Sequence, residues 1–173
     1  RHNLQAESAD FMLKPEFLNG ISKLKKYNLT YDIVIHAEQL ESALKMVKMF
    51  PEQSFVLDHA AKPNISENRI ELWKTNLKKL ADCQNVYCKV SGLVTEANWN
   101  TWVFADFKPI LEVIFEVFGV KRLLFGSDWP VCLLAADYDQ VTSIIANYTN
   151  SKSVAEKQGL WKDNTANFYN ISS

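Results

Sequence analysis

Two short segments carry side chains suited to hydrolytic chemistry, and each follows an apolar run of strand length. Residues 122–130 read Arg-Leu-Leu-Phe-Gly-Ser-Asp-Trp-Pro, so Asp128 comes just after one run. Residues 55–63 read Phe-Val-Leu-Asp-His-Ala-Ala-Lys-Pro, so His59 comes just after the other. The carboxyl ends of parallel strands are where α/β enzymes keep their catalytic groups. We therefore predict that Asp128 and His59 are catalytic. No G-x-S-x-G elbow is present, so water is the expected nucleophile.

The other two histidines also lie at the ends of apolar runs. His36 follows the run Tyr31–Ile35, and His2 lies in the opening run. Each is either a structural histidine or a residue of the substrate pocket, and we predict the second role for both. Arg1 can bind a substrate carboxylate or hydroxyl. Trp129, in the same segment as the catalytic acid, completes the predicted substrate-binding set.

Polar residues flank the catalytic pair on two strands. Asp58 precedes His59, and strand alternation predicts that it points to the opposite face in a structural role. Lys89 and Ser91 share one face of the run Val86–Val90. A buried lysine is costly without a carboxylate partner, so Lys89 is either paired beside the site or turned towards solvent.

The longest irregular stretch, residues 92–105, follows the Val86–Val90 run. Loops at the carboxyl side of strands often line a pocket. This stretch contains Glu96, Trp99 and Trp102. These residues either line a pocket or cover the end of a helix.

Strand-like runs alternate with helix-like ones along the whole chain. Helical spacing predicts a helix that starts near Asp106, has Pro109 in its first turn and stops at Gly119. Such alternation indicates a parallel sheet. An open doubly wound sheet and a (β/α)₈ barrel both fit, and length alone favours the open sheet, since a barrel takes about 250 residues. The strands are expected at residues 1–5, 31–35, 55–57, 86–90 and 122–125.

Composition excludes several function classes. The 173 residues are 47% hydrophobic and 23% charged, with a formal net charge of −1, which is typical of one globular domain. No basic surface for nucleic acid or anionic membrane is indicated, no run reaches the roughly 18 residues of a membrane span, and no G-x-G-x-x-G turn supports dinucleotide binding. Three cysteines without metal-ligand spacing suit a reducing compartment, so we expect a cytoplasmic protein that takes a small-molecule substrate, with homo-oligomerisation left open.

Three segments resemble the amidohydrolase-related family of the amidohydrolase superfamily, which contains sugar-lactone and pyrone-dicarboxylate lactonases. They are YDIVIHAEQLESALKMVKMFPEQSFVLDHAAKP, VYCKVSGLVTEANWNTW and RLLFGSDWPV. The opening RHNLQAE and the closing NTANFYNI are similar to the family as well. The resemblance implies a partial TIM (β/α)₈ barrel over residues 1–173, made of strands four to eight with flanking helices and lacking the amino-terminal strands.

The resemblance also implies a reaction and roles for the candidate residues. Asp128 corresponds to the strand-eight aspartate that activates water, and His59 to a strand-six histidine that helps to bind metal or substrate. The expected reaction is the opening of a sugar-acid lactone. His59 and Asp128 are also the metal-ligand candidates for one divalent ion such as zinc, but the paired His-x-His of strand one has no counterpart here, so the alternative is no metal.

Two other functions stay open on the sequence. One is a metal-dependent decarboxylase or amidase of the same superfamily. The other is a non-catalytic barrel fragment, since five barrel strands alone leave two unpaired sheet edges.

Overall fold

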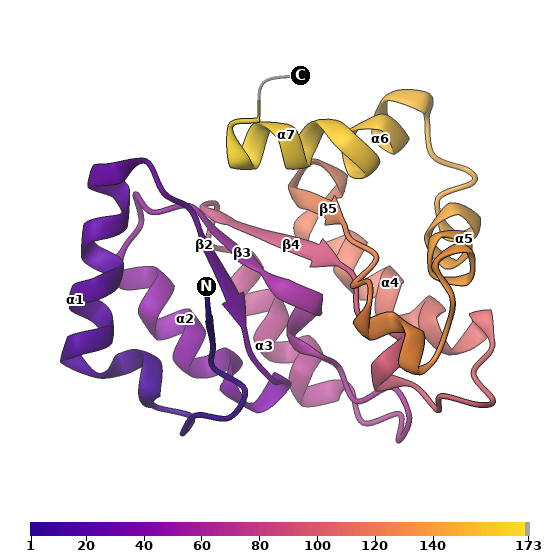
Figure 1. The fold of residues 1–173 in the computed structure, drawn as a ribbon, viewed down its shortest axis with the longest axis horizontal. Helices are drawn as coiled ribbons and strands as arrows, with labels where there is room; N and C mark the ends of the chain where they lie inside the picture. The colour runs from indigo at the N-terminus through magenta and orange to yellow at the C-terminus, as the bar shows by residue number, and fades with distance from the viewer. Residues whose placement is uncertain (172–173) are drawn as a thin grey trace.

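The computed structural model describes residues 1–171, which form five parallel strands with helices between them (Figure 1). The strands hydrogen-bond in chain order, each to the next. A doubly wound sheet reverses its strand order at a switch point, whereas consecutive order is that of a barrel wall. The prediction of α/β structure with a barrel-like parallel sheet is confirmed. The strands are β1 (His2–Asn3), β2 (Tyr31–Val34), β3 (Phe55–Leu57), β4 (Val86–Val90) and β5 (Leu123–Phe125).

Helices connect the strands and continue beyond the last one. The first four follow β1 to β4 in turn, as βα units require. A short π-helical turn, Gly159–Asp163, joins the last two helices. The helices are α1 (Pro15–Leu24), α2 (Leu40–Met49), α3 (Glu71–Ala81), α4 (Phe104–Phe118), α5 (Tyr138–Tyr148), α6 (Val154–Gln158) and α7 (Asn164–Tyr169). None of the helices in residues 1–171 is long and apolar enough to cross a membrane.

The two faces of the sheet differ in chemistry because side chains alternate along each strand. In β4, Val86, Cys88 and Val90 are fully buried and join the main core with α1 to α5. Tyr87 and Lys89, between them, are only partly buried on the other face. We call this second face the inner face.

The inner face carries charged residues and one small apolar cluster. Val56 of β3 and Leu124 of β5 are fully buried there against Phe168 of α7. Figure 1 accordingly shows α7 across the sheet from α2 and α3. The last helix therefore covers part of the inner face, while the first four helices cover the opposite one.

Helix α4 begins two residues earlier than its sequence pattern predicts. Asp106 lies in the first turn, where its carboxylate accepts a hydrogen bond from the Val103 backbone N–H at 2.9 Å. Pro109 consequently lies inside the helix rather than in its first turn. Gly119 ends the helix as expected, with a left-handed φ of 65°.

Candidate active site

His59 and Asp128 lie side by side at the carboxyl edge of the sheet. His59 follows β3 and Asp128 follows β5, and these strands flank β4. His59 Nε2 lies 3.7 Å from Asp128 Oδ1, and the two side chains are 13% and 14% exposed. The structure thus brings the two predicted catalytic residues together from positions 69 apart in the chain, with a small opening to solvent.

The end of β4 fills the gap between the two flanking strands and orients the imidazole. Ser91 is buried, and its Oγ shares a hydrogen bond of 2.9 Å with His59 Nδ1. Gly92 has φ +63°, and a Cβ at this position would lie 2.8 Å from His59 Nδ1 and 3.1 Å from Asp128 Oδ2. Only glycine fits here, because the backbone is left-handed and the two catalytic groups occupy the space of a side chain.

The turn that presents His59 is a run of left-handed residues. His59, Ala60, Ala61 and Lys62 have φ values of 52°, 48°, 58° and 50°. Each costs about 1–2 kcal/mol in this conformation. The buried Trp73 of α3 holds the turn by donating an indole N–H to the Ala60 carbonyl at 2.7 Å. Backbone strain of this kind is common at functional sites. Here the left-handed turn determines the direction of the His59 imidazole.

The pair has a neutral imidazole beside a carboxylate. Burial lowers the pKa of His59 below its ordinary value, and attraction to Asp128 and Asp58 offsets only part of this effect. Among residues 1–171, the Asp128 carboxylate accepts no hydrogen bond. At neutral pH the site therefore holds an uncharged hydrogen-bonding ring and a carboxylate that can accept a proton.

Asp58 lies on the inner face, two residues after Val56, as strand alternation predicts, and it has a structural role there. Its fully buried carboxylate pairs with Arg1 at 3.0 Å and with Lys89 at 2.8 Å. Lys89 also binds Asp32 at 2.5 Å, which settles its two alternatives in favour of pairing.

Lys89 stays charged within this network. Burial alone lowers the pKa of Lys89, but the hydrogen bonds to Asp32 and Asp58 outweigh it and raise the pKa above its ordinary value. The Tyr169 hydroxyl donates to Asp32 at 2.8 Å, and burial raises the pKa of Tyr169 to about 12. These residues form a connected polar network on the inner face.

The four predicted substrate-binding residues have different surroundings in the structure. Arg1 is joined to the buried Asp58 on the inner face. His36 lines a cavity of about 370 Å³ beyond β2 and β3, and Trp129 is 64% exposed next to the catalytic acid. His2 is not brought to the pair, because its ring stacks on Phe11 towards α1 and contacts Glu7.

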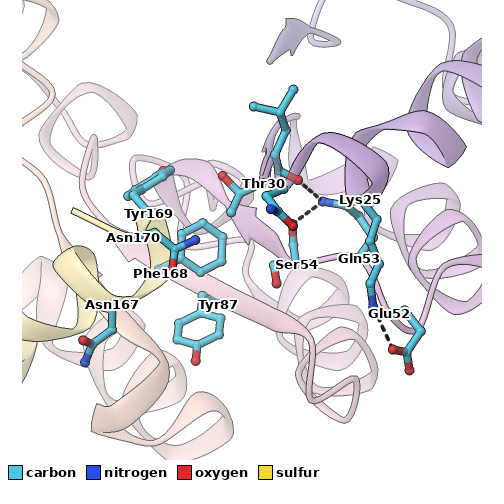
Figure 2. A pocket seen from close by; sticks show the side chains of 12 residues that line it. Lys25, Thr30, Glu52, Gln53, Ser54, Tyr87, Asn167, Phe168, Tyr169 and Asn170 are labelled. Carbon is cyan, nitrogen blue, oxygen red and sulfur yellow. Dashed lines mark hydrogen bonds and ion pairs between the residues drawn. The ribbon is translucent and has the colours of Figure 1, made fainter. Parts of the chain in front are cut away.

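A second cavity, of about 780 Å³, lies at the other edge of the sheet. Thr30 and Ser54 line it just before β2 and β3 begin, and the aromatic residues of α7 close one side (Figure 2). Lys25 bridges to Glu52 at its rim. None of the predicted catalytic residues lines it, so its size does not make it the active site.

The described residues do not complete a zinc site. A catalytic zinc ion takes three protein ligands as a rule. Within residues 1–171, no group of three or more His, Cys, Asp or Glu side chains is placed to hold a metal. His59 and Asp128 supply two donors, and the neighbouring carboxylate of Asp58 is held in ion pairs by Arg1 and Lys89, which are cations that cannot bind a metal.

Sequence reasoning missed the roles of three residues at this site, Ser91, Gly92 and Lys62. Ser91 and Gly92 form a Ser-Gly pair directly after a strand, which is a signal for a close backbone approach. Nothing in the sequence indicated that Lys62 would pair with Glu96, whose Oε1 lies 2.6 Å from Lys62 Nζ.

The comparisons with known proteins agree on one family. A family model described as Amidohydrolase matches residues 1–171. An L-fucono-1,5-lactonase from Burkholderia multivorans is 38% identical over 98% of this chain and 61% of its own length. Another from Burkholderia ambifaria is 34% identical over 75% of this chain and 44% of its own. The chain therefore spans about three fifths of the first of these relatives.

The fold has a close counterpart among solved structures. A crystal structure of an amidohydrolase from Burkholderia multivorans with bound zinc superimposes with a TM-score of 0.96 at 36% identity. The match covers 99% of this chain and 64% of that one. The five strands and their helices thus correspond to a part of that amidohydrolase.

Proposed function

The chain belongs to the amidohydrolase family, and from this premise we propose that it forms part of a hydrolase that opens a sugar-acid lactone with water. The observation that carries the proposal is the approach of Asp128 to within 3.7 Å of His59 at the carboxyl edge of the sheet. A carboxylate that accepts no hydrogen bond, next to a neutral imidazole, suits base-assisted attack of water on a carbonyl carbon. The names of the related lactonases support the choice of a cyclic ester.

In the proposed reaction, Asp128 is the general base. Its carboxylate takes a proton from water while the water oxygen bonds to the lactone carbonyl carbon. The tetrahedral intermediate then collapses, the bond between the carbonyl carbon and the ring oxygen breaks, and Asp128 returns the proton to the leaving oxygen. The product is the open-chain hydroxy acid.

His59 stabilises the developing oxyanion in this scheme. Ser91 Oγ shares a hydrogen bond with Nδ1, and Nε2 faces the acid. In the proposed reaction the Ser91 hydroxyl is the donor, so the ring proton is on Nε2. The Nε2–H can then donate to the carbonyl oxygen as negative charge develops on it. Arg1, His36 and Trp129 are proposed to contact the substrate around this centre.

Replacing the proposed base tests the function directly. In the complete gene product that contains this chain, Asp128→Asn should lower kcat for a sugar-acid δ-lactone about 10²–10⁴-fold, because the amide cannot accept the water proton. The matched control is Asp139→Asn, the same change at an exposed acid in α5, which should leave kcat unchanged. Hydrolysis would be followed by acid release at constant pH. Undiminished turnover by Asp128→Asn would contradict the proposal.

A further inference from the structure

A cavity beside the catalytic pair carries a charged pair that the proposed chemistry does not use. It has a volume of about 370 Å³, within the range of about 300–1,000 Å³ for small-ligand sites. His36 lines it from the end of β2, and Lys62 lines it from the turn that presents His59. The loop after β4 forms another wall with Thr95, Glu96 and Trp99, and Glu38 and Glu67 contribute to the rest of the lining.

Backbone contacts tie this cavity to the catalytic pair on both sides. The Lys62 N–H donates to the His59 carbonyl at 2.8 Å. The Thr95 hydroxyl donates to the carbonyl of Gly92 at 3.0 Å, and Gly92 is the residue packed against His59 and Asp128. The cavity is therefore bordered by the two backbone segments that also position His59 and Asp128.

The polar groups in the cavity match a polyol. Lys62 Nζ and Glu96 Oε1 lie 2.6 Å apart, and their side chains are 18% and 19% exposed. The carboxylate can accept hydrogen bonds from hydroxyls and the ammonium can donate to them. Trp99 is 47% exposed, and its indole N–H donates to the Thr95 carbonyl at 2.9 Å, which fixes the ring at the rim.

The charge of the lining argues against an anionic ring. Its described residues carry the carboxylates of Glu38, Glu67 and Glu96 against one ammonium, that of Lys62. A substrate with additional carboxylates would meet no net positive charge there. A neutral ring with several hydroxyls satisfies the same groups without a charge penalty.

We propose that Lys62, Glu96 and Trp99 form the subsite that recognises the ring hydroxyls of a neutral polyhydroxylated lactone. This inference rests on the proposed lactonase function and assigns substrate specificity to residues outside the catalytic pair. The competing interpretation is that Lys62 and Glu96 are a structural clamp between the His59 turn and the loop after β4. The two interpretations differ in which substrates a variant affects.

The test compares two lactones in the complete gene product. Glu96→Gln should lower kcat/KM for a hydroxylated δ-aldonolactone about tenfold while changing that for δ-valerolactone, which has no hydroxyls, less than twofold. Lys62→Met should do the same. Glu41→Gln and Lys45→Met, in an exposed pair on α2, are the matched controls and should affect neither substrate. Equal losses on both lactones would indicate the clamp and overturn the subsite.

A binding measurement separates this inference from the lactonase proposal. Isothermal titration with the aldonolactam, whose ring N–H replaces the ring oxygen, and with δ-valerolactam needs no turnover. The wild type should bind the hydroxylated lactam about tenfold more tightly than Glu96→Gln does, with no such difference for valerolactam. If no lactone is hydrolysed, the proposed function fails, and this titration still decides the subsite. Equal binding of the hydroxylated lactam by both proteins overturns it.

Discussion

At the scale of single residues, the site depends on Gly92 as much as on the groups that do chemistry. His59 and Asp128 come from different strands, and their approach leaves no room for a side chain on the backbone between them. Ser91, one residue earlier, fixes the imidazole through Nδ1. The geometry of the pair is therefore determined at the end of β4, in a segment that carries neither catalytic group.

Under the proposed function, Gly92→Ala should lower kcat strongly, and Gly119→Ala should not. Both glycines have positive φ, +63° and +65°, so an alanine is strained at both positions. Only at Gly92 does the new Cβ meet catalytic atoms, since nothing lies within 4 Å at Gly119. We expect kcat to fall about 100-fold for Gly92→Ala alone, the loss typical of a small displacement of a catalytic group. Steady-state kinetics and thermal melting of both variants measure this, and equal kinetic losses would refute it.

At the scale of elements, the sequence pattern predicts the strands well and the turns poorly. Phe55–Leu57 and Val86–Val90 are strands as expected, because apolar runs of that length are buried on a parallel sheet. The left-handed turn from His59 to Lys62 has no signal in the alternation of side chains, because it follows the strand. The meeting of His59 and Asp128 at one edge of the sheet was predictable from the strand ends, whereas the contacts that support them depend on tertiary packing.

The network of Lys89 links three strands, and a double-mutant cycle should detect it. Lys89 pairs with Asp32 of β2 and with Asp58 after β3. Lys89→Met leaves the fully buried Asp58 with Arg1 alone, so we expect the free energy of unfolding to fall by about 3 kcal/mol. Combining it with Asp58→Asn should cost at least about 1 kcal/mol less than the sum of the single changes.

Urea denaturation of the four proteins in the cycle supplies the free energies. Lys108→Met, which removes an exposed lysine on α4, serves as the control and should stay within about 0.5 kcal/mol of the wild type. Strictly additive single changes would show that Lys89 and Asp58 do not interact.

At the scale of the whole molecule, the sheet is covered differently on its two faces. One face is buried under α1 to α5, while the inner face exposes parts of Asp32 and Lys89 and receives α7 at one end. The chain spans 61% of the length of the related L-fucono-1,5-lactonase, so it corresponds to a part of that relative. Within residues 1–171, the apolar contacts that cover the inner face are those between Phe168 of α7 and the strand residues Val56 and Leu124.

Removing the Phe168 side chain from the inner face should destabilise the protein. Phe168 is 6% exposed, joins Val56 and Leu124 in the inner cluster, and lies with its ring centre 4.9 Å from that of Tyr87. Phe168→Ala should lower the free energy of unfolding by about 3 kcal/mol, at the low end for a buried phenylalanine because the cluster is small. Ile171→Ala, at a 57% exposed position just beyond α7, should change it by less than about 0.5 kcal/mol. Denaturant unfolding of the complete gene product measures both. A Phe168→Ala protein as stable as Ile171→Ala would mean that α7 does not pack on the inner face.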